Sequence, residues 1–147
     1  MFRIAVAPAV LLALLPAIAS AAPVESSYTA SMTLVSSTCG ETLGTEMERQ
    51  VSIVKDGKKY TITPVEVGLE ARYTGYAIRD GFTVALESAC PVVPNPACSP
   101  NSETITALKR GAGGRSYSVV WLIVARNADN TLSCVNVWTG KAVRDKQ

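Results

Sequence analysis

The 147-residue chain contains no histidine. Histidine is the side chain that most often acts as a general base at neutral pH, and it is a common metal ligand. Without it a zinc site would have to consist of cysteines alone, and no Cys-x-x-Cys spacing occurs. The Gly-x-Ser-x-Gly, Walker and Gly-x-Gly-x-x-Gly motifs are absent as well. We therefore expect no catalytic residue, no metal site and no cofactor.

A strong net charge is also missing. The formal net charge is +2 at pH 7, and basic residues adjoin one another only in the pairs Lys58-Lys59 and Lys109-Arg110. Electrostatic binding of nucleic acid requires a dense basic patch. The sequence therefore predicts no nucleic-acid partner and indicates that both pairs lie at solvated turns.

The longest apolar run, Ile4–Ile18, follows the single charge of Arg3. It is shorter than the about 20 residues that span a membrane, and two prolines interrupt it. The next residues, Ala19-Ser20-Ala21, have the small side chains that precede a cleavage site. The pattern predicts a signal peptide over residues 1–21, cleaved after Ala21 or after Ala19. The mature chain, residues 22–147, is then one exported domain, secreted or periplasmic, without a membrane span.

All four cysteines lie in the predicted mature chain. An even number of cysteines in an exported domain indicates disulfides, and four cysteines allow three pairings. We predict one disulfide between Cys90 and Cys98, which would close a proline-rich loop. The second would then join Cys39 and Cys134.

Two Asp-Gly dipeptides organise the middle of the chain, and each separates two alternating runs. Asp-Gly favours a two-residue type I′ turn, which requires positive φ at both central residues. The first predicted hairpin covers Gln50–Thr63 and turns at Asp56-Gly57. The pairs it predicts are Val51 with Ile62, Ile53 with Tyr60, and Lys55 with Lys58.

The second predicted hairpin covers Arg72–Ser88 and turns at Asp80-Gly81. A two-residue turn would leave room for large side chains over Gly75 and Ala77, so we favour this register. Gly75 also indicates a close approach of two backbones. A three-residue turn, with Gly81 as a bulge, would instead bring Tyr76 and Ile78 onto the apolar face. In the favoured register that face carries Tyr73, Gly75, Ala77, Phe82, Val84 and Leu86.

Further strands are predicted on both sides of these hairpins. Alternation over Ser27–Thr38 and Thr131–Trp138 is typical of strands, whereas Ser102–Arg110 fits either a strand or a short helix. Ser116–Ala125 is apolar on both faces, which predicts a strand covered on both sides. The acidic segment Glu41–Arg49 is expected to be irregular, with room for a helical turn. The last residues, Gly140–Gln147, are expected to form a polar tail.

The sequence thus predicts an all-β fold, an antiparallel up-and-down meander of seven or eight strands that closes into a small barrel. A β-sandwich is the alternative. Closure removes both sheet edges and places the end of the first strand beside the start of the last, which is why we pair Cys39 with Cys134. The architecture resembles lipocalin-like barrels in outline. Their Gly-x-Trp motif near the first strand is absent here, and we assign no family.

An eight-stranded barrel is just wide enough for one small ligand. We therefore interpret the protein as a non-catalytic, exported binding domain for a small apolar ligand. The alternative is a protein-binding or inhibitor module that contacts a secreted or envelope protein through the loops Cys90–Cys98 and Gly111–Gly114. An enzyme without histidine-based catalysis is the minor alternative. The aromatic residues expected to point inward, either as core or as ligand contacts, are Tyr60, Tyr73, Phe82, Trp121 and Trp138.

Overall fold

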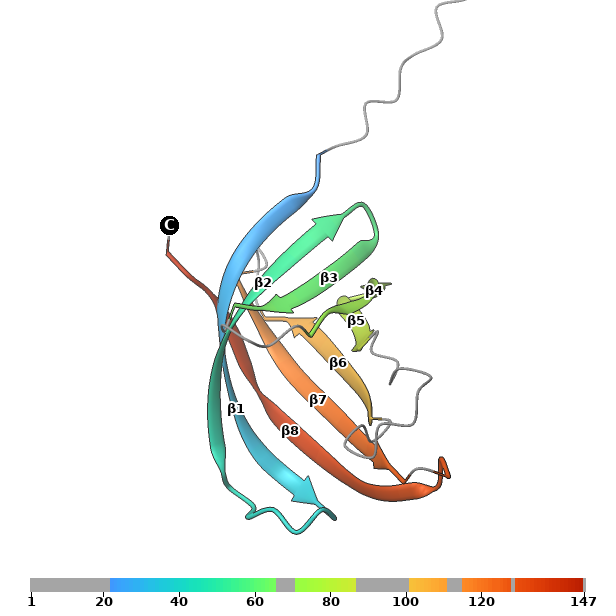
Figure 1. The fold of residues 1–147 in the computed structure, drawn as a ribbon. Helices are drawn as coiled ribbons and strands as arrows, with labels where there is room; N and C mark the ends of the chain where they lie inside the picture. Colours follow the sequence, from blue (N-terminus) through green and yellow to red (C-terminus); the bar gives the residue numbers. More distant parts are fainter. Residues whose placement is uncertain (1–21, 66–70, 87–100, 111–114, 128, 147) are drawn as a thin grey trace, which may run out of the picture.

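The fold follows the order of the strands in the chain. The structure is a computed structural model, and it describes residues 22–65, 71–86, 101–110, 115–127 and 129–146. Each strand pairs antiparallel with the next, and the last pairs with the first, so the sheet closes into a barrel (Figure 1). The predicted up-and-down barrel is confirmed, and the sandwich alternative is wrong. The strands are β1 (Val24–Ser37), β2 (Glu46–Asp56), β3 (Lys59–Pro64), β4 (Tyr73–Ile78), β5 (Gly81–Leu86), β6 (Asn101–Lys109), β7 (Ser116–Arg126) and β8 (Leu132–Arg144).

Some predictions concern residues outside the described part of the chain. They are the signal peptide over residues 1–21, the Cys90–Cys98 disulfide and the loop over residues 111–114. These three stay predictions, as does any contact that the two loops make with a protein partner.

The eight strands differ in length around the barrel. Strands β1, β2, β7 and β8 have 14, 11, 11 and 13 residues, whereas β3, β4 and β5 have six each. In Figure 1 the short strands β3, β4 and β5 lie together on one side of the barrel, and none of them reaches its lower end. We call the rim with the β2–β3 and β4–β5 turns the hairpin end. The opposite rim, where Cys39 and Cys134 lie, is the disulfide end.

The seam between β1 and β8 closes the barrel. Its pairing runs from Tyr28 opposite Arg144 to Ser37 opposite Asn136, with a register shift between Leu34 and Ser36. Just beyond β1, the backbone N–H of Thr38 donates to the carbonyl of Val135 at 2.9 Å. The seam therefore continues with a backbone hydrogen bond past the end of the ladder.

A disulfide lies at the lower end of this seam. The Cα atoms of Cys39 and Cys134 are 5.0 Å apart, and their sulfurs are bonded. The two cysteines are 95 residues apart in sequence. This confirms the predicted pairing, and it cross-links nearly the whole domain.

The first hairpin turns one residue later than predicted. Asp56 pairs with Lys59, so the central turn residues are Gly57 and Lys58. Gly57 has φ 57°, while Asn130 is the only non-glycine residue with positive φ in the described chain. Glycine at the first central position is typical of a type II′ turn, which needs positive φ only there. The predicted turn at Asp56-Gly57 is wrong because it would require positive φ at Asp56.

This shift changes the predicted partners but not the faces. Ile53 lies opposite Ile62, and Lys55 lies opposite Tyr60 rather than Lys58. A shift of two residues keeps every side chain on its side of the sheet, because side chains alternate with a period of two. Ile53, Tyr60 and Ile62 are accordingly buried inside the barrel. Val51 is half-buried on the same face.

The second hairpin turns one residue earlier than predicted. Ile78 pairs with Gly81, so Arg79 and Asp80 form the turn in place of Asp80-Gly81. The favoured faces are nevertheless confirmed, because Tyr76 and Ile78 are exposed, at 66% and 40%. Gly81 is needed for packing: a Cβ atom there would lie 1.9 Å from the carbonyl oxygen of Ala107 on β6.

Four other predictions concern where strands begin and end and whether β7 is covered. Residues 102–110 lie within and just after strand β6, so the strand alternative is confirmed. The segment Glu41–Arg49 was expected to be irregular, but β2 begins at Glu46 because its start pairs with β1. The expected C-terminal tail from Gly140 is also wrong, since β8 runs between β1 and β7 as far as Arg144. Strand β7 is uncovered outside: Val120 is 44% exposed and Leu122 36%.

Candidate ligand-binding site inside the barrel

An aromatic layer crosses the barrel near its hairpin end. Phe82 is at its centre, with no exposed surface. Its ring stacks on Tyr60 with a centroid distance of 4.3 Å and meets Tyr117 edge-on at 5.3 Å. The rings of Tyr117 and Tyr28 lie 5.6 Å apart. Phe82 and Tyr117 line the cavity below this layer, and Tyr28, Tyr60 and Tyr117 line a recess above it. The layer thus divides the interior into two compartments.

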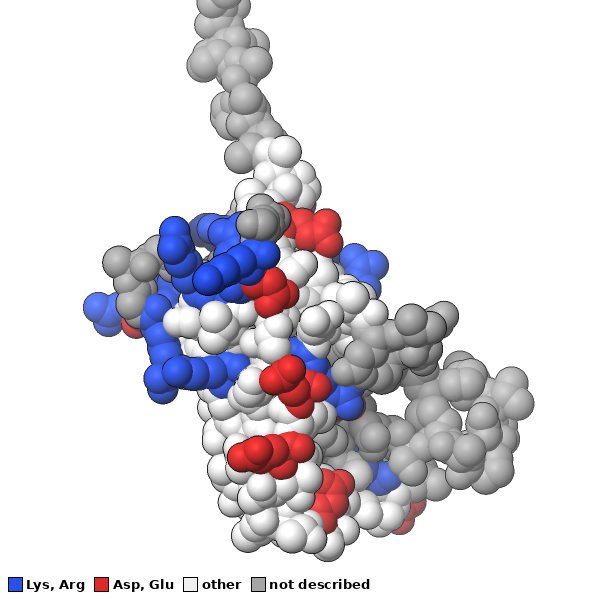
Figure 2. All heavy atoms as spheres, turned by 90° about the vertical axis from the view of Figure 1, so that its left-hand side faces the viewer, with Lys and Arg blue, Asp and Glu red and all other residues white. Residues whose placement is uncertain are grey.

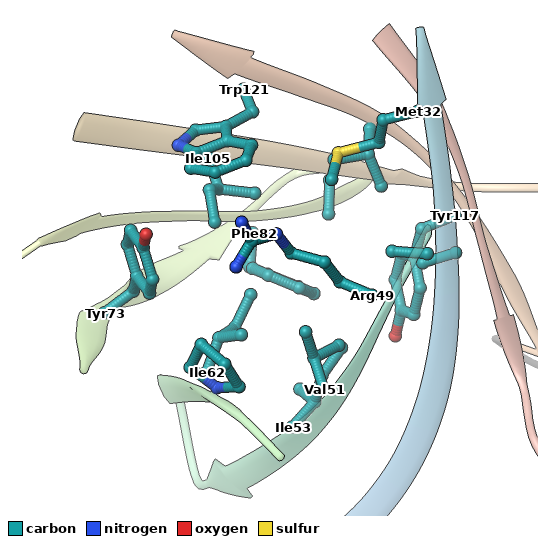
Figure 3. A pocket seen from close by; sticks show the side chains of 15 residues that line it. Met32, Arg49, Val51, Ile53, Ile62, Tyr73, Phe82, Ile105, Tyr117 and Trp121 are labelled. Carbon is teal, nitrogen blue, oxygen red and sulfur yellow. The ribbon is translucent and has the colours of Figure 1, made fainter. Parts of the chain in front are cut away.

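The compartment toward the disulfide end contains a cavity of about 60 Å³. Its walls are almost entirely apolar, and they include Met32, Ile62, Ile105 and Phe82 (Figure 3). Such a volume corresponds to roughly four or five water molecules. The interior is therefore mostly filled by side chains, with room for a small chemical group.

Of the described residues that line the cavity, only Arg49 carries a charge. It lies on β2 opposite Ala30, at an inward-facing position. In Figure 3 its guanidinium points into the cavity between Tyr73 and Trp121. The guanidinium carbon is 5.7 Å from the centroid of the Trp121 ring, and Nε donates to the sulfur of Met47 at 2.9 Å. A cation over an indole face is a favourable arrangement, and it holds the positive charge inside the barrel.

Glu103 on β6 ties two of the cavity's aromatic residues together. The same carboxylate oxygen, Oε2, accepts hydrogen bonds from the hydroxyl of Tyr73 at 2.6 Å and from Nε1 of Trp121 at 3.0 Å. Burial raises the pKa of Tyr73 far above its usual value, and the bond to Glu103 raises it further. Tyr73 therefore remains a protonated donor at any ordinary pH, and β4, β6 and β7 are linked through one acceptor.

All five aromatic residues predicted to point inward are buried in the barrel. Tyr73, Phe82 and Trp121 line the cavity, and Tyr60 belongs to the aromatic layer. Trp138 lies beside Trp121, with ring centroids 6.5 Å apart. Their inward orientation is confirmed, and contact with a ligand stays a prediction.

Arg49 and Glu103 were missed as site residues. Arg49 fell in a segment expected to be irregular, although Met47, Arg49, Val51 and Ile53 alternate in the way that would have placed all four on the inner face. Glu103 fell in a segment for which a helix was an open alternative. An earlier start for β2 would have placed Arg49 on the inner face, and a decision for the strand alternative over Ser102–Arg110 would have done the same for Glu103.

Two residues of β8, close to Trp121, have a buried polar atom without a partner among the described residues. Oδ1 of Asn136 and Nε1 of Trp138 have no hydrogen-bond partner in the described structure. The two residues are two positions apart, so their side chains share one face of the strand. Most buried polar groups in proteins are paired, so these two atoms mark the least satisfied part of the interior.

Two polar side chains of this site, Arg49 and Tyr73, act as hydrogen-bond donors. The guanidinium of Arg49 offers only hydrogen-bond donors, and Tyr73 keeps its proton because burial raises its pKa. The described residues contain no group of three or more metal-ligating side chains. Among these residues there is also no helix of the length and apolarity needed to cross a membrane. Compared with protein-family models and with curated proteins, the chain matches none.

Proposed function

We propose that this protein is a non-catalytic binding domain, active after export, that holds a small apolar ligand with one anionic group inside its barrel. The observation that carries the proposal is the apolar cavity into which the guanidinium of Arg49 points (Figure 3). An apolar wall favours the body of the ligand through burial, and the cation favours a carboxylate head.

The cavity volume limits the ligand. About 60 Å³ accepts only a few non-hydrogen atoms while the side chains stay in place. A longer ligand requires the Arg49 side chain to move toward the disulfide end. Strand β2 extends further in that direction than its neighbour β3, whose last residue pairs with Val51. Its side chain has several rotatable bonds, so this movement leaves the backbone intact. Short-chain carboxylic acids fit this description.

The groups around the cavity support binding rather than catalysis. A guanidinium offers only hydrogen-bond donors, and burial raises the pKa of Tyr73, so neither side chain serves as a base. The carboxylate of Glu103 already accepts two hydrogen bonds, which fix its position. The geometry therefore favours holding a ligand in one orientation.

Matched ligands test the proposal. We expect hexanoate to raise the thermal midpoint of the wild-type protein more than hexanol does, because only hexanoate pairs with Arg49. At a ligand concentration 100 times Kd, the stabilisation is about 2.7 kcal/mol, which shifts the midpoint by several degrees. Native mass spectrometry of the purified protein would identify a ligand that remains bound.

Two variants separate the parts of the site. Arg49→Met should abolish the preference for hexanoate over hexanol, whereas Arg72→Met, an exposed control with the same charge change, should keep it. Ile105→Phe fills the cavity and should weaken both ligands. If the wild-type protein shows no shift with a panel of short acids and carries no bound molecule, the proposal is wrong.

A further inference from the structure

The hairpin end of the barrel collects most of the positive charge of the described chain. Four acidic residues lie at the same end, namely Glu25, Asp56, Asp80 and Asp145. Figure 2 shows the Lys and Arg side chains crowded at the upper end of the face in view. Nine cationic residues lie at strand ends and turns there: Lys55, Lys58, Lys59, Arg79, Lys109, Arg110, Arg115, Arg144 and Lys146.

Three of these cations converge on a recess of about 300 Å³ at the mouth of the barrel. Lys55, Lys109 and Arg144 belong to β2, β6 and β8, and each lies on the inward-facing side of its strand. Inward positions of a barrel are usually apolar, so three cations around one mouth are unusual. The recess is of the size at which small-molecule sites begin.

Among the described residues, no carboxylate lines this recess. Two of the four acidic residues at this end accept hydrogen bonds on the outer face. Glu25 accepts a hydrogen bond from the hydroxyl of Ser52 at 2.7 Å, and Asp145 accepts one from the hydroxyl of Thr29 at 2.8 Å. The repulsion among the three inward cations is therefore not relieved by an acidic side chain in the recess itself.

The floor of the recess supplies neutral hydroxyl groups. Tyr28, Tyr60 and Tyr117 from the aromatic layer line it, together with Ser26, a buried serine on β1. Burial raises the pKa of Tyr117 to about 12, and the neighbouring Tyr28 adds to this effect. The phenol is thus protonated at neutral pH. Hydroxyl donors and cations together are the groups that surround bound oxyanions in proteins.

We propose that this recess binds a multiply charged phosphate group, held by Lys55, Lys109 and Arg144 above the tyrosine layer. A dianion matches three converging cations better than a monoanion does, and its oxygens accept bonds from several directions. The site is separate from the interior cavity, because Phe82 and the surrounding tyrosines lie between the two. The phosphate belongs either to a soluble molecule or to a lipid headgroup.

The first experiment uses pyrophosphate as the probe, at constant ionic strength, with binding measured by titration calorimetry. The triple variant Lys55→Gln/Lys109→Gln/Arg144→Gln should bind at least about tenfold more weakly than the wild type, since each lost charge-assisted contact weakens binding. The matched control Lys58→Gln/Lys59→Gln/Arg79→Gln removes equal charge from the same rim, outside the recess. It should change Kd less than about threefold, because salt screens exposed charges.

The second experiment distinguishes the two sources of phosphate. Phosphatidylcholine vesicles with and without phosphatidic acid are sedimented with each protein. Binding that requires phosphatidic acid, is lost in the recess variant and is displaced by pyrophosphate supports a lipid headgroup. Pyrophosphate binding without vesicle binding supports a soluble phosphate.

The same experiments can overturn the proposal. Equal weakening by the two triple variants would mean that the whole rim attracts anions and the recess does not bind one. Absence of binding to both probes by the wild type would also overturn it. Thermal midpoints establish that the variants are folded. If the recess triple variant does not fold, the single variant Lys109→Gln should still weaken binding several-fold relative to Lys58→Gln.

Discussion

The two ends of this barrel are built from the same strands, but they differ in the charge of their side chains. At the hairpin end nine cations lie on the rim, and three of them line a recess whose floor includes three tyrosines. Toward the disulfide end, an apolar cavity contains one inward cation, Arg49, and the rim carries the acidic residues Glu41, Glu46 and Glu48. The aromatic layer around Phe82 separates them. An up-and-down barrel can therefore carry cations on one rim and acidic residues on the other, because every second connection returns to the same end.

The largest expected effect concerns the disulfide end. Replacing Cys39 and Cys134 by serine should lower the free energy of unfolding by about 4 to 5 kcal/mol, because the bridge closes a long loop in the unfolded chain. Urea denaturation of the double variant and the wild type measures the difference. The hairpin end should be unaffected, so pyrophosphate affinity under native conditions serves as the control. An unchanged denaturation midpoint would contradict the prediction.

The layer between the two ends gives the next effect. Phe82→Ala should destabilise the protein by about 3 to 5 kcal/mol, since the ring is fully buried. Phe82→Leu is the milder control and should cost about 1 to 2 kcal/mol. Where the alanine variant remains folded, the two compartments should join, and larger apolar ligands should bind. A cost below 1 kcal/mol for Phe82→Ala would show that the layer contributes little.

A smaller effect is expected at the acceptor that joins β4, β6 and β7. Tyr73→Phe removes one of the two hydrogen bonds to Glu103 and should cost about 1 to 3 kcal/mol. Tyr76→Phe changes the exposed neighbour by the same atom and should cost less than about 0.5 kcal/mol. Chemical denaturation compares the two. Equal costs would mean that the Glu103 bridge is not important for stability.

The smallest effect is a pH dependence at the hairpin end. The folded-state pKa of Tyr117 is raised to about 12 from the model-peptide value of 10.0, so its contribution is fully present below pH 10 and is lost as pH rises through 12. Between pH 9 and 11 the wild type should therefore lose more stability than Tyr117→Phe, by roughly 1 kcal/mol. Urea midpoints at both pH values provide the measurement. Parallel losses in the two proteins would contradict it.

Much of the fold was predictable because period-two alternation and sheet closure are strong constraints. The Cys39–Cys134 pair followed from closure alone, and the five inward aromatic residues followed from alternation. The turn positions were each wrong by one residue, for two different reasons. Gly57 occupies the first central position of its turn, where positive φ is needed. The glycine of the second hairpin is required for packing rather than for its turn. Gly81 is required by the carbonyl of Ala107 on a strand far along the chain, and no local pattern reports that contact.

The candidate sites were less predictable because residues far apart in the sequence form them. Lys55, Lys109 and Arg144 are far apart in sequence, so no local charge pattern indicated that they form one cluster. Only the register of β2, β6 and β8 brings them to one mouth. Arg49 was not recognised because β2 begins at Glu46, inside a segment whose composition indicated an irregular connection. Charge patches formed by topology must be sought after the strand order is known.

The unequal strand lengths also determine which part of the wall opens first. Strands β3 and β4 are joined by four residue pairs, whereas β7 and β8 are joined by eleven. Fluctuations that break few ladder hydrogen bonds are the most frequent, so amide exchange should be fastest along β3–β4 and slowest beside the seam. Transient opening of the β3–β4 pairing would give the ligand proposed above a route past Ile62 and Tyr73 while the rest of the barrel stays intact.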